Sequence, residues 1–384
     1  MVASAVASTD VLTGAATHGP LTTSLRSRKY EYPLLPYEEL FRNFASVEGP
    51  GYAPFYEELC AEIGEQPAVA GLLGAAPEGQ RRHTLLLAAL HAVVLRYPAE
   101  PLGRWYPSVP GRAPTIPLGE ALARFVAEHE GEIRSIVAQR RTQTNEVARC
   151  AVLEPVVAWA NADVHEPLLL IDLGASAGLN LLLDRWHYDY SDGTTRGALA
   201  SEVEITSEVR GPTSIPSMPA PVIAGRIGID LEPVDVTDPE ATGWLEACIF
   251  PEQAERLERL RRALRVAASW PPEVVAGTVL EHLPGILDRA GEAPVCVFDT
   301  WLLPYLAEEE RQTLAELIAD RGLTHPISWI CGEPARAIPG FHPPADAPGE
   351  ATCWVVRRYR PGEETAESLV AYSHPHGAWL DWQA

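Results

Sequence analysis

The sequence is poor in positive charge. Its 384 residues include 30 Lys and Arg against 52 Asp and Glu, a formal net charge of −22, and its lone lysine is Lys29. This acidic excess argues against nucleic acid or an anionic membrane as the main partner, because phosphate binding requires a concentrated basic surface. A single lysine in a polar N-terminal region also argues against Schiff-base chemistry and against the phosphate-binding lysine of a P-loop.

Paired cysteines and long apolar runs are missing as well. The six cysteines are scattered without a C-x-x-C pair, which predicts buried free thiols, no metal site and a reducing, cytoplasmic location. No run approaches the ~20 apolar residues that a membrane-spanning helix needs. Residues 1–28 lack a basic start followed by an apolar stretch. We therefore expect a disordered tail there rather than a signal peptide.

Two kinds of pattern divide the rest of the chain. Up to about residue 145, apolar residues recur at helical spacing, which predicts a helical domain over 30–145. From residue 146 to 384, short apolar runs alternate with helical stretches, which predicts an α/β domain with a doubly wound parallel sheet. The strand-like runs are 167–172, 222–230, 272–277, 294–299 and 326–331. An insertion, 187–221, interrupts this alternation, and 352–359 with 368–373 predict a C-terminal hairpin.

The most informative segment is Asp172-Leu-Gly-Ala-Ser-Ala-Gly178, between the first expected strand and a helix that begins at Leu179. Small residues let a ligand approach the backbone, and a helix N-terminus offers unpaired amides. The dinucleotide pattern G-x-G-x-x-G is not met. The segment instead resembles the first motif of class I S-adenosylmethionine-dependent methyltransferases, with Ser176 in place of the middle glycine. This resemblance implies cofactor contacts at Asp172, Gly174, Ser176 and Gly178.

A second motif follows at Arg226-Ile-Gly-Ile-Asp230. It resembles the methyltransferase strand whose terminal acid accepts hydrogen bonds from the ribose hydroxyls, a role that Asp230 would fill. The distance from the first motif is much longer than the ~20 residues expected. The insertion contains Tyr188-Asp-Tyr190, which is an alternative second strand with Asp189 as the ribose acid. We favour Asp230.

Two further strand ends carry polar residues. Thr278 stands where these methyltransferases often keep an acid near the adenine. Asp299-Thr-Trp301 ends the fourth expected strand, where the resemblance places the methionine part of the cofactor and the substrate. We expect Asp299 as a catalytic carboxylate and Trp301 as a substrate contact, with a helix cap as the alternative for Asp299. The Asn/Asp-Pro-Pro-aromatic motif of nucleic-acid base methyltransferases is missing here, which disfavours a nucleic-acid substrate.

Polar residues outside the sheet motifs lie at the domain junction and near the C-terminus. In Thr144-Asn-Glu-x-x-Arg149 we expect Glu146 and Arg149 as catalytic or anchoring groups, and Thr144 and Asn145 as substrate contacts. An N-cap at Thr144 with a surface ion pair is the alternative. His376, in His374-Pro-His-Gly377, is a candidate proton carrier and substrate contact; a terminal loop held by aromatic residues is the alternative. Glu333 is a weaker site candidate.

Together with Thr300-Trp-x-x-x-Tyr305, these segments resemble a mainly actinobacterial family of unknown function on a methyltransferase-like fold, over residues 36–382. The resemblance implies a Rossmann-like sheet of the class I methyltransferase type that binds S-adenosylmethionine or S-adenosylhomocysteine. It also implies a small-molecule substrate in specialised metabolism, such as natural-product biosynthesis.

Three functions fit that resemblance. Methyl transfer is the default. The second is a non-methylating ring closure. Some relatives are associated with aziridine formation, in which S-adenosylhomocysteine is bound and sulfate leaves. Arg149, Arg140 or Arg141 would stabilise the departing sulfate. The third is a non-catalytic, nucleoside-binding subunit of a partner enzyme.

Overall fold

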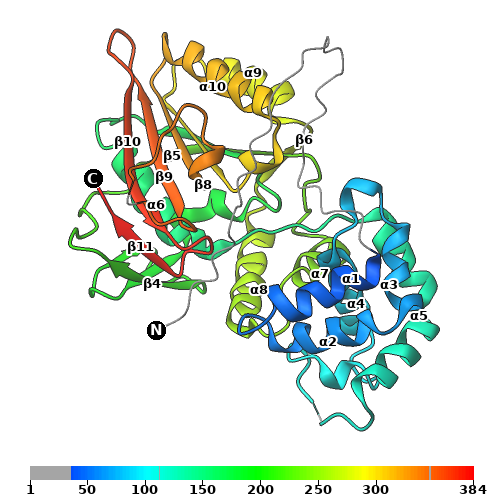
Figure 1. Ribbon diagram of the computed structural model, residues 1–384. Coiled ribbons are helices and arrows are strands. Elements are labelled where there is room, and N and C mark those ends of the chain that lie inside the picture. The colour runs from blue at the N-terminus through cyan, green and yellow to red at the C-terminus, as the bar shows by residue number, and fades with distance from the viewer. Residues whose placement is uncertain (1–35, 112, 346) are drawn as a thin grey trace, which may run out of the picture. The chain divides into compact units, whose positions relative to one another are not determined.

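The computed structural model describes residues 36–111, 113–345 and 347–384 (Figure 1). The expected disordered tail, residues 1–28, and Lys29 lie outside the described residues. The described part of the chain belongs to one compact unit. No helix in this part is long and apolar enough to cross a membrane.

The N-terminal half is helical, as the apolar spacing predicts. Its α-helices are α1 (Tyr37–Asn43), α2 (Pro54–Gly64), α3 (Pro67–Ala70), α4 (His83–Arg96) and α5 (Leu118–Gln139). Helix α4 is buried on nearly all sides and forms the centre of this group. The core of the group also includes Trp244 and Ala247 from α7 (Pro239–Ala247). A helix from the α/β half of the chain therefore completes the helical core.

The second half builds one mixed sheet of eleven strands. The strands are β1 (Leu168–Leu173), β2 (His187–Tyr190), β3 (Thr195–Gly197), β4 (Glu204–Arg210), β5 (Ile223–Asp230), β6 (Glu273–Ala276), β7 (Val295–Thr300), β8 (Ile327–Pro334), β9 (Thr352–Tyr359), β10 (Ala366–Ser373) and β11 (Trp379–Trp382). Their order is β3-β2-β4-β11-β10-β9-β8-β7-β1-β5-β6. Strands β6, β5, β1, β7 and β8 are parallel neighbours, so the predicted parallel core is present.

The predicted C-terminal hairpin is confirmed, because β9 and β10 pair antiparallel. The hairpin also extends the sheet beyond β8, since β9 pairs with β8 and β10 with β11. The insertion continues it further: β4 pairs with β11 and β2 with β4. Arg196, from β3, forms an ion pair with the buried Glu154 at 2.5 and 3.1 Å. This pair fixes the insertion to the helix that precedes β1.

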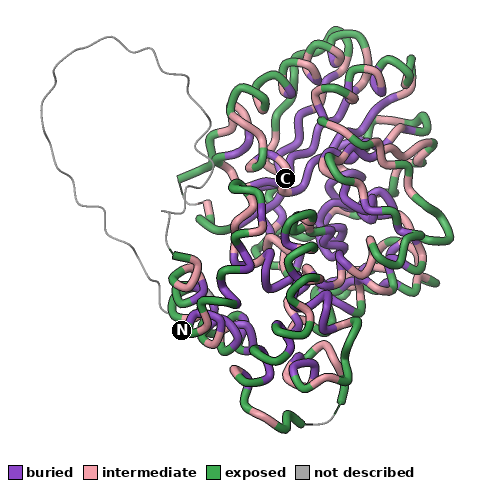
Figure 2. Tube along the Cα trace, turned by 90° about the vertical axis from the view of Figure 1, so that its right-hand side faces the viewer, coloured by how far each residue is buried: buried purple, intermediate pink, exposed green. Residues whose placement is uncertain are grey.

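Helices cover both faces of the sheet. One face packs against α6 (Cys150–Ala160), the 3₁₀-helix η6 (Leu179–Arg185) and α8 (Ala254–Ser269). The other packs against α9 (Val279–Ala290) and α10 (Glu308–Gly322). Alternate residues of β1 enter the two cores, Leu168 and Leu170 on one side and Ile171 and Leu173 on the other. Burial on both faces explains the continuous apolar runs of the central strands (Figure 2).

Candidate functional site

Backbone strain is concentrated at the carboxyl ends of β1 and β7. The chain leaves β1 toward β5 on one side, and returns to β7 on the other, so strand order reverses between these two strands. Ligands of open α/β sheets bind at such a switch point. Among the described residues, the two non-glycine residues with positive φ are Ser176 (52°), in the glycine turn after β1, and Trp301 (63°), directly after β7. Such strain is found most often at functional sites.

The glycine turn after β1 is tightly enclosed. Gly174 and Gly178 have φ values of 80° and 69°. A Cβ on Gly178 would lie 2.8 Å from two side-chain atoms of Pro272, and one on Gly174 would lie 3.1 Å from the Leu302 side chain. Both positions therefore require glycine for conformation and for space. Gly178 packs the turn against the neighbouring sheet edge, whereas Gly174 faces the segment after β7.

The segment after the turn differs from the expectation. It forms the 3₁₀-helix η6, with an irregular residue at Leu182, instead of an α-helix. Its first amide is not free, because Leu179 N donates to Asn145 Oδ1 at 3.2 Å. Asn145, expected as a substrate contact, therefore holds the linker between α5 and α6 (residues 140–149) against the glycine turn. Thr144 is exposed.

Asp230 lies against the glycine turn. Its Oδ2 accepts a hydrogen bond from Ser176 N at 2.8 Å, and its Oδ1 accepts one from Glu232 N at 2.9 Å. Asp189 lies elsewhere, in β2, where it pairs with His187 at 3.2 Å. Since β2 neighbours β3 and β4, and β1 neighbours β5 and β7, the alternative second strand is wrong. The acid at the turn is Asp230.

Asp172 is buried beneath the turn, and its Oδ2 has no hydrogen-bond donor among the described residues. Burial raises the pKa of this carboxyl well above its usual range, and the nearby Asp230 and Asp299 raise it further. The raised pKa favours the neutral form of Asp172. A neutral carboxyl can donate a hydrogen bond, which an ionised one cannot.

Asp299 and Glu333 form a second buried carboxyl pair, on the neighbouring strands β7 and β8. Both side chains are fully buried. Trp329 Nε1 donates to Asp299 Oδ2 at 2.7 Å, and the backbone N of Leu302 donates to Glu333 Oε1 at 2.6 Å. The two carboxyl groups interact closely enough that a proton on one of them would be hydrogen-bonded to the other. Burial raises the pKa of Asp299 to about 6 and that of Glu333 well above its usual range.

Asp299 is not a helix cap, which was the alternative role for this residue. Asp299 lies within β7 and caps no helix. Glu333 instead accepts hydrogen bonds from the backbone N of Leu302 and Leu303, at 2.6 and 3.2 Å. It therefore holds the segment after β7, in which the Trp301 indole donates to Thr352 Oγ1 at 3.0 Å. Thr278, at the end of β6, is the N-cap of α9.

Glu146 is an ionised anchor. It caps the short 3₁₀-helix η5 (Val147–Arg149) by accepting a hydrogen bond from Ala148 N at 3.1 Å, so the N-cap is Glu146 and not Thr144. It forms ion pairs with Arg256 and Arg259 of α8, the latter at 3.6 Å. Burial raises the pKa of Glu146, but the two guanidinium groups and the nearby charges lower it more, to below its usual range. A carboxylate with a lowered pKa is a weak base, so Glu146 suits the role of an anchor better than that of a general base at neutral pH.

Arg149 joins the linker to both the sheet and the C-terminal loop. Its Nε donates to the carbonyl of Pro375 at 2.8 Å, and its Nη1 donates to the carbonyl of Thr300 at 3.3 Å. The guanidinium carbon lies 6.0 Å from the centroid of the Trp301 ring. The side chain is buried and forms no ion pair within the described residues. Its positive charge is therefore available to an anionic group.

The C-terminal loop, His374–Gly377, packs directly on η5. Gly377 has a φ of 73°, and a Cβ there would overlap the carbonyl oxygen of Ala148. Ser207 Oγ also donates to the carbonyl of Gly377 at 2.8 Å. Burial and the positive charge of Arg256 lower the pKa of His376 to about 3. The imidazole is therefore neutral near pH 7, next to Glu146 and Arg149.

The fold thus brings Asn145, Glu146 and Arg149 together with His376, from two segments that are far apart in the sequence. The arginines expected to stabilise sulfate lie differently: Arg140 pairs with Glu240 at 2.9 Å and Arg141 pairs with Glu232 at 3.0 Å. The site residues that the sequence did not indicate are Arg256, Arg259 and Leu302. Arg256 and Arg259 lie among other charged residues of α8, in a pattern typical of a solvent-exposed helix face, so the sequence did not indicate that they belong to a site.

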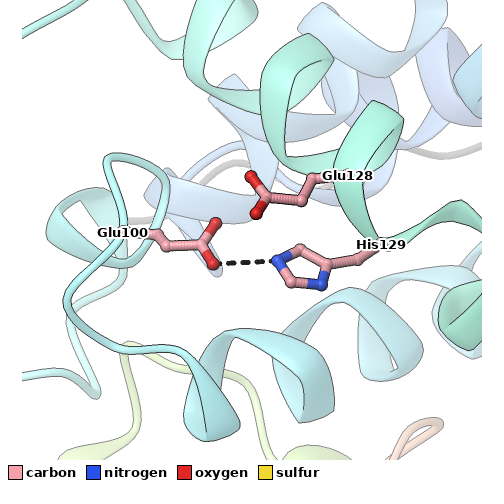
Figure 3. Close-up of side chains that lie close together, drawn as sticks. All are labelled: Glu100, Glu128 and His129. Atoms are coloured by element: carbon pink, nitrogen blue, oxygen red, sulfur yellow. Dashed lines mark hydrogen bonds and ion pairs between the residues drawn. The ribbon is translucent and has the colours of Figure 1, made fainter.

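One group of potential metal ligands comes together in the part of the chain that the structure describes. Glu100, Glu128 and His129 place their ligand atoms within 4.8 Å of one another (Figure 3). His129 Nε2 and Glu100 Oε1 lie 2.9 Å apart, and the imidazole stacks on Tyr97 with the centroids 4.4 Å apart. These contacts account for the arrangement as a link between α5 and the connection that follows α4.

Comparisons with other proteins identify a family and no function. No curated protein matches the chain, and no solved structure matches it. A family model described as "Uncharacterized protein conserved in bacteria (DUF2332)" matches residues 38–382. Because the match covers nearly the whole chain, the protein belongs to this family.

Proposed function

We propose that this protein is an enzyme of methyltransferase fold that binds S-adenosylmethionine or S-adenosylhomocysteine and acts on a small molecule. The observation that carries the proposal is the position of Asp230 against the Gly174–Gly178 turn, at the switch point of the sheet. Each oxygen of Asp230 accepts one backbone amide and keeps a further lone pair, which can accept a ribose hydroxyl. The nucleoside would lie between these two strand ends.

Strand order supports the same fold. Numbered along the chain, the parallel strands β6, β5, β1, β7 and β8 have the order 3-2-1-4-5. This is the order of the first five strands of an open doubly wound sheet. The antiparallel β9 then adds to β8. The glycine turn and the acid therefore occur on the first and second strands, as a nucleoside site at the switch point requires.

Methyl transfer is an in-line displacement, which needs an aligned nucleophile and a site that excludes water. Arg149 would hold an anionic group of the substrate, since it is buried and forms no ion pair with a carboxylate among the described residues. Asp299, whose pKa of about 6 lies near neutrality, forms a proton-sharing pair with Glu333 next to the Trp301 segment. Glu146 would position the linker.

Arg149 also favours the second candidate, a non-methylating ring closure in which an anion leaves. A buried guanidinium stabilises a departing oxyanion by bidentate hydrogen bonding. In that reaction, bound S-adenosylhomocysteine would have a structural role. A non-catalytic subunit that binds the nucleoside for a partner enzyme remains the third hypothesis.

Calorimetric titration with S-adenosylmethionine and with S-adenosylhomocysteine tests the proposal. We expect Asp230→Ala to weaken binding at least about tenfold, or about 1.4 kcal/mol, and the matched Asp189→Ala to leave it unchanged. Asp230→Asn, which keeps one acceptor for the turn, separates ribose binding from folding. Binding of neither ligand to folded protein would contradict the nucleoside site. Transfer of label from a methyl-labelled donor would then separate methyl transfer from the other two functions.

A further inference from the structure

Guanidinium groups outnumber carboxylates around Glu146. Arg256 and Arg259 approach this carboxylate from α8, and Arg149 lies next to it at the end of η5. Within the described residues, Glu146 is the acid that forms ion pairs with Arg256 and Arg259, and Arg149 has no such partner. Three positive charges therefore surround one negative charge, in a chain whose net charge is −22.

Two neighbouring groups respond to this local positive charge. Besides burial, the pKa of His376 is lowered by Arg256 and Arg149, which leaves the imidazole neutral. Burial lowers the pKa of Arg149, and Arg256 contributes in the same direction. A cluster in which cations depress one another's protonation is short of negative charge. An anion that enters would supply the missing charge.

The arginines of α8 also keep hydrogen-bonding capacity. Arg259 Nε is buried and has no acceptor among the described residues. Arg256 donates from Nη1 to Gln253 Oε1 at 2.9 Å and from Nε to Glu146. A narrow crevice is lined by these two arginines together with Asn145 and Glu146. As the side chains stand, this crevice has no room for a group the size of water, so an anion would bind there only after the arginine side chains move apart.

We propose that this crevice, lined by Glu146, Arg256 and Arg259, binds one small oxyanion group. Arg259 would donate from Nε and one Nη along an edge of its guanidinium plane, the geometry that matches carboxylate, phosphate and sulfate oxygens. The role of that group as part of the substrate rests on the proposed function. Anion binding itself follows from the charge balance and does not depend on it.

The arrangement narrows the substrate class of the proposed enzyme. Asn145 lies in the same crevice and also bonds to Leu179, directly after the glycine turn. The oxyanion group would therefore bind on the linker side of the nucleoside site. A small molecule with a carboxylate, phosphate or sulfate substituent meets this requirement, whereas a cationic one does not.

Calorimetric titration with inorganic phosphate and with inorganic sulfate tests the inference on the full chain, at an ionic strength held constant with sodium chloride. We expect Arg259→Gln to weaken binding of the preferred ion at least about fivefold. Arg262→Gln is the matched control, because Arg262 lies on the same helix and pairs with Glu258 on its exposed face at 3.1 Å. This variant should bind as the wild type does.

Stability distinguishes an anion site from a structural ion pair. If Arg259 served only to neutralise Glu146, Arg259→Gln would lower the unfolding midpoint. We expect no decrease, because the substitution removes one of three positive charges that repel one another and Arg256 still pairs with Glu146. Arg259→Lys, which keeps the charge without the planar fork, should bind with intermediate affinity. Binding of neither ion by the wild type, or equal affinity in wild type and Arg259→Gln, would overturn the inference. Titration of the same proteins with S-adenosylhomocysteine tests the proposed function separately.

Discussion

Gly377→Ala tests the contact that closes the site at the C-terminus. Gly377 has a φ of 73°, and a Cβ there would overlap Ala148 O and lie 2.6 Å from the carbonyl carbon and 3.0 Å from Arg149 N. The left-handed conformation costs alanine about 1–2 kcal/mol. Overpacking against fixed backbone adds about 1–3 kcal/mol. We therefore expect the free energy of unfolding to fall by about 2–5 kcal/mol.

Gly362→Ala is the matched control. Gly362 has a φ of 82°, and a Cβ there would have no neighbour within 4 Å. It should lose only the conformational part, about 1–2 kcal/mol. The difference between the two variants in urea unfolding, followed by tryptophan fluorescence, isolates the steric part. Equal losses in both would refute the close approach of the C-terminal loop to η5, and with it the position of His376 beside Glu146.

Two further substitutions test buried charges. Folding raises the pKa of Asp299, so its contribution to stability is present below about pH 4 and is lost as the pH rises through about 6. In Glu333→Gln, the side-chain amide can donate the hydrogen bond to Asp299, so the variant should gain stability relative to the wild type as the pH rises from 4 to 8. If the urea midpoints of the two proteins change with pH in parallel, the proton between the two carboxyl groups is contradicted. Arg196→Ala leaves buried Glu154 without its partner and should cost about 3–5 kcal/mol. The exposed pair of Arg134 with Glu130 gives the control, and Arg134→Ala should cost less than about 0.5 kcal/mol in the same assay.

Local patterns predicted the elements of the sheet well. The apolar runs on the central strands reflect burial on both faces. Each run spans only six or eight consecutive residues, so it can be recognised from the local sequence. The glycine turn was also recognisable, because Gly174 and Gly178 need conformations that other residues rarely adopt. The helix after the turn was predicted at the right residues, Leu179–Arg185, but it is a 3₁₀-helix. Its first amide donates to Asn145, a contact from outside the helix that no local pattern contains.

The roles of individual site residues depended on contacts that no local pattern contains. Glu146 and Arg149 were expected as catalytic or anchoring groups, and they lie at the two ends of a single 3₁₀ turn. Glu146 is bound to Arg256 of α8, and Arg149 to Pro375 near the C-terminus. Glu333 was a weak candidate, although it holds the strained segment after β7. Its partners are backbone amides, which any sequence provides.

The sequence by itself determined the class of fold, the glycine turn and the acids at the strand ends, because burial and backbone conformation select residue types locally. Tertiary structure decided which strand lies beside β1, and therefore that Asp230 and not Asp189 meets the turn. It also decided the charge balance around Glu146. Both depend on pairings between residues far apart in the chain, whose free energies arise only when the sheet and its helices are packed together.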